Sequence, residues 1–217
     1  KANQKGDLNL YKEQLKKSQK LVIFLAIPSL IGLSICAEHL ISTLFQRGEF
    51  LYSDVIQASK SLIAFSIGLP FFMMMKVLVP AFFSRKDTKT PMYAAIAALL
   101  VNVILNYIFA IKLGYGHTGL ALASSIAAIL SSGILFIILV KDNYIQLSNP
   151  LNKFNAAILI ASLAVILFLL NSPFNINFDS INFAQRLMYL SLEVGISALL
   201  YFGLAKVVLG NRLRELF

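Results

Sequence analysis

The sequence predicts an all-α membrane protein, a polytopic bundle of about six transmembrane helices. Three observations lead to this prediction. Apolar residues make up 58% of the 217 residues and charged residues only 13%, whereas a soluble domain carries about 25% charged residues. The charged residues are gathered in short clusters between long apolar blocks. Each block can cross a hydrocarbon core of about 30 Å, because a helix rises about 1.5 Å per residue.

Six apolar blocks define the predicted spans. Strands are not expected, because the alternation of apolar and polar residues that is typical of barrel strands is missing. In lipid, only helices and closed barrels satisfy all their own backbone polar groups. The predicted spans are residues 21–45, 62–83, 92–113, 120–140, 154–170 and 187–209.

The positive charges are distributed unevenly between the two sides of these spans. The side that holds both chain ends carries 14 of the 19 Lys and Arg residues: Lys1, Lys5, Lys12, Lys16, Lys17, Lys20, Arg85, Lys86, Lys89, Lys141, Lys153, Lys206, Arg212 and Arg214. The opposite side carries Arg47, Lys60, Lys112 and Arg186. The positive-inside rule therefore predicts that both ends are cytoplasmic. The net charge of +9 reflects this topology, and we expect no nucleic-acid partner.

The chain divides into three predicted segments. Residues 1–20 form a basic amphipathic cytoplasmic segment, because Leu8, Tyr11 and Leu15 share one helical face and lysines occupy the rest. Such a helix rests on an anionic inner leaflet; the alternative is a solvated loop. Residues 21–140 hold four spans, and residues 141–217 hold an appended pair of transmembrane helices.

Charged residues within the spans are functional candidates, since a charge in the bilayer costs a few kcal/mol or more. Lys76 lies four residues before Pro80, which has no N–H, so we expect a kink with a freed carbonyl beside a cation. This pair would contact a cavity or substrate; alternatively, Lys76 snorkels toward Arg85 and Lys86. Glu193 lies inside the last span, where it pairs across helices, faces a groove or reaches the interface. The candidate substrate or transport residues are Lys76, Pro80, Arg85 and Glu193.

Amide and hydroxyl side chains mark the third and fourth spans. Asn102 and Asn106 are four residues apart and share one helical face. Ser124 lies on the next span, which also carries small residues at close-packing spacing. One interpretation is hydrogen bonding between the helices, and the other is a cation coordinated by the amide and hydroxyl oxygens.

No catalytic group emerges from the sequence. Only two of the ten acidic residues, Glu38 and Glu193, fall inside spans, and they lie in different helices. Nucleophile-elbow, zinc-protease and phosphate-loop motifs are missing. His39 and His117 have no companions at metal-ligand spacing, and the single cysteine, Cys36, cannot form an intrachain disulfide. We therefore predict no enzymatic activity and, apart from the cation considered above, no cofactor.

Two stretches resemble a known family. They are GlnArgGlyGluPhe at residues 46–50, followed by Asp54, and LysValLeuValProAlaPhePheSerArgLysAspThrLysThrPro at residues 76–91. Together with Asn102, Asn106 and GlyLeuAlaLeuAlaSerSer at residues 119–125, they resemble the MurJ (MviN) lipid II flippases. The resemblance extends over roughly residues 1–140, and the last two spans match only in hydropathy.

The resemblance implies a fold and a function. Such proteins belong to the multidrug/oligosaccharidyl-lipid/polysaccharide exporter superfamily and have fourteen spans in the bacterial inner membrane. They move the lipid-linked peptidoglycan precursor to the outer leaflet by alternating access, for cell-wall synthesis. This chain looks like spans nine to fourteen, a C-terminal portion whose partners are the N-terminal half of the transporter, membrane lipids and the lipid-linked oligosaccharide. In the family, the final pair lines a groove for the polyprenyl tail.

The resemblance also bears on the cation interpretation and on activity. Some members place a sodium ion at positions that match Asn102, Asn106 and Ser124, although Asn106 stands where sodium-binding members have an acidic residue. The family's essential cavity arginines lie outside this chain, so the chain alone is not expected to transport. The alternatives are another exporter of the same superfamily, for an O-antigen-type lipid or drugs, and a non-transporting membrane scaffold for cell-wall synthesis. The stretch at residues 76–91 favours the flippase.

Overall fold

A computed structural model describes residues 2–145, 152–173, 178 and 181–210. The regular elements in these residues are all helices, as the sequence predicts, and six of them are long and apolar enough to cross a membrane. The elements are α1 (Ala2–Ile35), α2 (Ala37–Phe45), α3 (Tyr52–Phe83), α4 (Lys89–Asn106), the π-helix η1 (Tyr107–Lys112), α5 (Gly116–Lys141), α6 (Lys153–Leu170) and α7 (Phe183–Leu209). Lys1, Arg212 and Arg214 of the predicted charge asymmetry lie outside the described residues.

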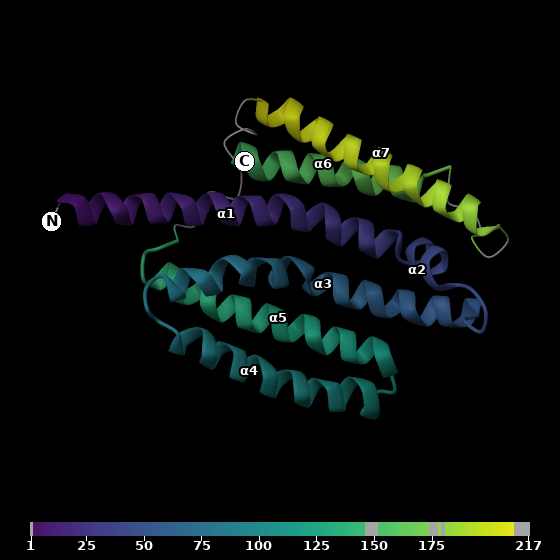
Figure 1. The fold of residues 1–217 in the computed structure, drawn as a ribbon, viewed down its shortest axis with the longest axis horizontal. Helices are drawn as coiled ribbons and strands as arrows, with labels where there is room; N and C mark the ends of the chain where they lie inside the picture. The colour runs from purple at the N-terminus through teal and green to yellow at the C-terminus, as the bar shows by residue number, and fades with distance from the viewer. Residues whose placement is uncertain (1, 146–151, 174–177, 179–180, 211–217) are drawn as a thin grey trace.

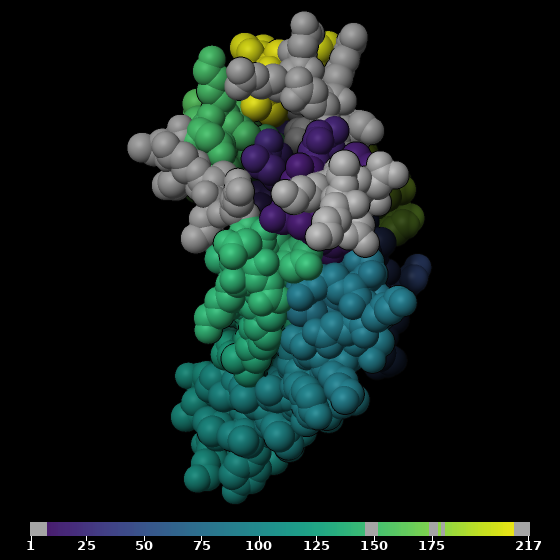
Figure 2. Space-filling model, turned by 90° about the vertical axis from the view of Figure 1, so that its left-hand side faces the viewer, coloured from purple at the N-terminus to yellow at the C-terminus, as the bar shows by residue number. Residues whose placement is uncertain are grey.

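The helices form two groups that share α1 (Figure 1). On one side of α1 lies α3, which packs on α5, and α5 in turn packs on α4. On the other side lie α6 and α7, which pack on each other. Viewed from the end, the molecule is a narrow stack with α4 at one edge and α7 at the other (Figure 2).

Each group has its own apolar core, and α1 contributes to both. One core lies between α1, α6 and α7, where Phe24 and Tyr201 are almost completely buried and the Tyr201 hydroxyl donates to the Phe24 carbonyl oxygen at 2.7 Å. The other lies between α1, α3, α4 and α5 and includes Leu15, Phe82 and Leu139. Leu15 and Phe24 are nine residues apart, so at about 100° per residue they lie on opposite faces of α1.

Three predicted boundaries differ from the structure. The predicted span 21–45 is broken at Cys36, where α1 ends and α2 begins. The span predicted from residue 62 begins at Tyr52, because the Asp54 carboxylate accepts the Leu51 N–H at 2.8 Å and starts the helix ahead of the apolar block. The segment predicted as a separate amphipathic helix at residues 1–20 runs from Ala2 into the first span without a break.

The closest approach between α3 and α5 uses small residues. A Cβ atom on Gly68 would lie 2.8 Å from the Ser125 Cα atom and 2.7 Å from its hydroxyl oxygen. The Ser125 hydroxyl is buried and donates to the Ala64 carbonyl oxygen at 2.7 Å. Small and hydroxyl-bearing residues let membrane helices approach closely and bond across the contact. The backbones of α3 and α5 therefore lie close together at Gly68 and Ser125.

Candidate functional site

Lys76 and Pro80 lie on the exposed side of α3. The α3 helix continues through Pro80 without a break. The Lys76 side chain is exposed, and it forms no hydrogen bond or ion pair with the part of the chain that the structure describes. A cation on an apolar, exposed helix face is available to a ligand or to a neighbouring part of a larger protein. Its role in transport stays a prediction.

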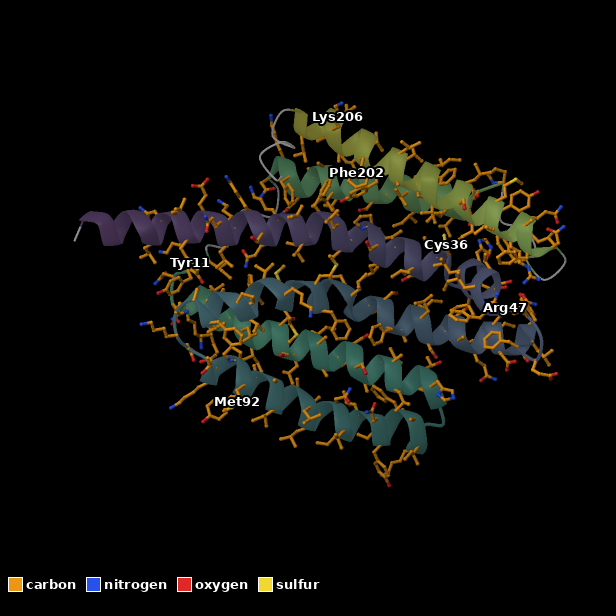
Figure 3. All side chains as sticks on the ribbon, in the orientation of Figure 1. Tyr11, Cys36, Arg47, Met92, Phe202 and Lys206 are labelled. Carbon is orange, nitrogen blue, oxygen red and sulfur yellow. The ribbon has the colours of Figure 1, made fainter. Side chains whose placement is uncertain are left out.

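Arg85 is held at the end of α3 by α5. Its Nη2 atom donates to the Asp142 Oδ2 atom at 2.7 Å, and its guanidinium lies 4.1 Å from the centroid of the Tyr144 ring. Tyr11 on α1 packs edge-on against Tyr144 and donates its hydroxyl hydrogen to the Ala81 carbonyl oxygen at 2.8 Å. Figure 3 shows Tyr11 at this end of the molecule, on the side of α1 that faces α3 and α5. Arg85 thus joins the ends of α3 and α5 and is committed to partners within the chain.

The α3–α4 turn explains part of the stretch at residues 76–91. Lys86 adopts a left-handed conformation with φ 61°, and the Asp87 N–H donates to the Phe82 carbonyl oxygen at 3.1 Å, which closes α3. The Asp87 carboxylate then accepts the Thr90 hydroxyl at 2.6 Å and the Thr90 N–H at 3.0 Å. These two hydrogen bonds lower the pKa of Asp87. Their contribution to the stability of the folded protein is therefore present at neutral pH and is lost as the pH falls through the lowered pKa. The Asp87 and Thr90 side chains therefore stabilise the turn itself.

Glu193 is buried between α7 and α2. Its side chain is 2% exposed, and its Oε2 atom lies 2.8 Å from the Nδ1 atom of His39. The imidazole is stacked on the Phe178 ring at a centroid distance of 3.9 Å. Glu193 therefore pairs across helices, one of the three interpretations that the sequence left open. The order of residues does not connect His39 with Glu193, although a buried carboxylate requires a partner at a similar depth.

Arg186 extends this polar contact by two turns of α7. It is 8% exposed, and its Nη1 atom donates to the Gln46 Oε1 atom at 2.8 Å and to the Ser42 carbonyl oxygen at 3.3 Å. Its place in the sequence, just before the last apolar block, indicates which side of the membrane it lies on but not that it is buried. Together His39, Ser42, Gln46, Arg186 and Glu193 form what we call the α2–α7 polar cluster. It fastens the last span to the break after α1.

Asn102, Asn106 and Ser124 are brought together, as the cation interpretation required. The Asn106 amide donates to the Asn102 Oδ1 atom at 3.0 Å, and the Asn102 amide donates to the Ser124 hydroxyl at 3.4 Å. Among these three residues, only the Asn106 Oδ1 atom is a buried oxygen without a hydrogen-bond partner in the structure. These hydrogen bonds join α4 to α5, and the binding of a cation at these residues stays a prediction.

An apolar cavity of about 450 Å³ lies between α1, α2, α6 and α7. Its lining is almost entirely apolar and includes Leu33, Val165 and Tyr201. Cys36, at the junction of α1 and α2, and Phe202, on α7, also line it and are labelled in Figure 3. A cavity of this chemistry accepts a hydrocarbon chain rather than a polar group.

Comparisons with known proteins agree with this architecture. The family described as "Lipid II flippase MurJ" matches residues 1–189. A probable lipid II flippase MurJ of Vibrio cholerae is 49% identical over 117 residues, which cover 54% of this chain and 22% of the relative. A probable lipid II flippase MurJ of Haemophilus influenzae is 33% identical over 91% of this chain and 38% of its own length. The lipid II flippase MurJ of Burkholderia cenocepacia is 33% identical over 96% of this chain and 40% of its own length.

A solved structure of a lipid II flippase is also similar to this chain. The inward closed conformation of lipid II flippase MurJ superposes with a TM-score of 0.76 at 26% identity, over 96% of this chain and 41% of that one. The fold therefore defines a multi-pass helical membrane protein. The chain belongs to the MurJ lipid II flippase family. It spans about two fifths of the length of the Haemophilus and Burkholderia relatives.

Proposed function

We propose that this chain is the C-terminal portion of a lipid II flippase that works by alternating access in the bacterial inner membrane. The observation that carries the proposal is the family match over residues 1–189 together with the superposition on a MurJ structure over nearly the whole chain. The chain supplies most of one lobe and the appended pair of helices, and the rest of the transporter supplies the other lobe and the remainder of this one.

Two features of the structure support this function. The cavity between α1, α6 and α7 is large and apolar, so it suits part of a polyprenyl tail. Lys76 is an exposed cation in an apolar span, so it is free to face the anionic pyrophosphate of the substrate across the cavity between lobes. An anionic headgroup in a low-dielectric core needs such compensating charge.

The function is tested by complementation in cells depleted of their own lipid II flippase. The full-length protein that contains this chain is expected to restore growth, and this chain expressed alone is not. Lys76→Ala is expected to reduce the rescue severely, whereas Lys76→Arg retains part of it because the charge is kept. Lys60→Ala, which removes another exposed lysine of α3, serves as the matched control.

Each result of this experiment decides between functions. Full rescue by Lys76→Ala would favour the alternative interpretation, in which Lys76 snorkels toward Arg85 and Lys86. Failure of the full-length protein, shown to be inserted, would favour an exporter of another lipid or a scaffold for cell-wall synthesis. Rescue by this chain alone would overturn its assignment as a portion of the transporter.

The orientation is a separate prediction, with both chain ends in the cytoplasm. In a cysteine-free version of the full-length protein, which includes Cys36→Ala, single cysteines at Glu49 and Asn171 are expected to react with a membrane-impermeant maleimide in intact cells. Cysteines at Lys86 and Asn143 are expected to react only after the inner membrane is permeabilised. The reverse pattern at both pairs of sites would contradict the positive-inside argument.

A further inference from the structure

A small polar pocket lies where α1 passes the end of α5. It has a volume of about 190 Å³. Its lining comes from one face of α1 and from the residues that follow α5, namely Asn9, Lys12, Lys16, Gln19, Tyr144 and Ile145. It is separate from the apolar cavity at α7 and from the α2–α7 polar cluster, which lie around the other end of α1.

The buried amide of Gln19 indicates that the pocket takes a hydrogen-bond acceptor. Gln19 is 8% exposed, and its Nε2 atom has no hydrogen-bond partner among the residues that the structure describes. Burying an amide donor without an acceptor is unfavourable, so such donors normally meet a protein group, water or a ligand. Gln19 lines a pocket that two lysines also line.

The charges around the pocket are not balanced within the described part of the chain. Lys17, on another face of α1, pairs with Glu13 at 3.3 Å, and the Asp142 carboxylate is taken by Arg85. Lys12 and Lys16 have no carboxylate partner among the described residues, and the Lys12 Nζ atom lies 5.9 Å from the centroid of the Tyr144 ring. The pocket therefore presents two ammonium groups and an amide donor, which suits an anion.

The depth of the pocket relative to the membrane indicates which kind of anion it binds. Lys16 lies five residues before Leu21, where the apolar part of α1 begins, which is about 7.5 Å along a helix. The headgroup layer of a bilayer extends roughly 5–8 Å beyond the hydrocarbon core. If α1 crosses the membrane close to its normal, the two lysines lie at the level of the lipid phosphates.

We propose that this pocket binds the phosphate of an anionic phospholipid headgroup, with Lys12, Lys16 and the Gln19 amide as donors. A basic pocket between transmembrane helices is a recognised form of anionic-lipid site. The bound lipid would join α1 to the end of α5, next to the Arg85–Asp142 ion pair. The site shares no lining residue with the apolar cavity at α7.

The test measures lipid retention by the full-length protein in nanodiscs of phosphatidylcholine with added phosphatidylglycerol, using native mass spectrometry. The double variant Lys12→Gln/Lys16→Gln is expected to bind phosphatidylglycerol at least about tenfold more weakly than the wild type, from the loss of two surface lysines. Gln19→Met, which keeps the volume and removes the amide, is expected to weaken binding as well. Lys17→Gln is the matched control and is expected to leave the affinity unchanged, because Lys17 already has a carboxylate partner.

The outcomes separate this site from transport and from other anions. Equal retention by the wild type and the double variant would overturn the proposal, and so would an equal loss in Lys17→Gln. If inorganic phosphate, added to the protein in pure phosphatidylcholine, raises the melting temperature as much as phosphatidylglycerol does, the lipid assignment is wrong. Should the double variant fail to insert, Lys16→Gln alone makes the same comparison at an exposed side chain, with an expected loss of about fivefold. The partial rescue of growth expected of Lys76→Arg does not depend on any of these results.

Discussion

His39→Leu in the full-length protein is expected to lower the free energy of unfolding by about 1–3 kcal/mol, the usual cost of leaving a buried polar group without its hydrogen-bond partner. The substitution leaves the Glu193 carboxylate, which is 2% exposed, without the nitrogen that lies 2.8 Å from it. The stability is measured by denaturant titration in detergent micelles. His117→Leu, at an exposed histidine, is the matched control and is expected to change little.

A second substitution distinguishes loss of the His39–Glu193 contact from simple loss of packing, because the two predict opposite changes in stability. Adding Glu193→Leu to His39→Leu removes the buried side chain that has lost its partner, so the double variant is expected to be more stable than His39→Leu alone. Replacing both partners of a buried hydrogen bond by apolar groups can be nearly neutral or stabilising. A double variant whose loss equals the sum of the two single losses would show that His39 and Glu193 act independently.

Gly68→Ala is expected to destabilise the four-span group by about 1–3 kcal/mol, which is the usual cost of overpacking a tight contact. The added Cβ atom would lie 2.8 Å from the Cα atom of Ser125, so backbone rather than a flexible side-chain tip would have to move. Gly133→Ala on α5 is the control, because an added Cβ atom there has no heavy atom within 4 Å. The measurement is the melting temperature of each purified variant in the same detergent.

The comparison of the two glycines also tests the α3–α5 contact itself. Both substitutions add one methyl group to a transmembrane helix and raise its intrinsic helix propensity. A difference between them therefore reports the local fit between α3 and α5. Equal melting temperatures would contradict the close approach of α3 to Ser125.

The spans could be predicted because hydropathy is summed over about 20 residues, and a single polar residue does not change the result. The break at Cys36 was missed for the same reason, since the residues on both sides of it are apolar. The early start of α3 depends on one hydrogen bond, from the Leu51 N–H to Asp54, which hydropathy does not register.

The candidate site was predicted less completely, because pairing is a property of three-dimensional contact. Glu193 could be singled out as a charge in an apolar span, but nothing in the order of residues connects it to His39, which lies 154 positions away. Arg186 was misjudged because it stands at the polar edge of the last span, where charge usually faces water. Asn102, Asn106 and Ser124 were grouped correctly, because helical spacing and adjacency of consecutive spans decide that contact.

The two-sided packing of α1 has a consequence for biosynthesis. The face of α1 that carries Leu15 can find its partners once α5 has been made at Lys141. The face that carries Phe24 waits for α6 and, last, for Tyr201, which lies 177 residues after Phe24 and whose hydroxyl donates to the Phe24 carbonyl oxygen. At about 5–20 residues per second, synthesis from the end of α5 to the end of α7 takes roughly 3–14 s. During that interval the part of this face that still lacks partners lies against lipid, which is as apolar as its later partners. A nascent chain in the membrane can therefore hold one finished core and one unfinished core on the same helix.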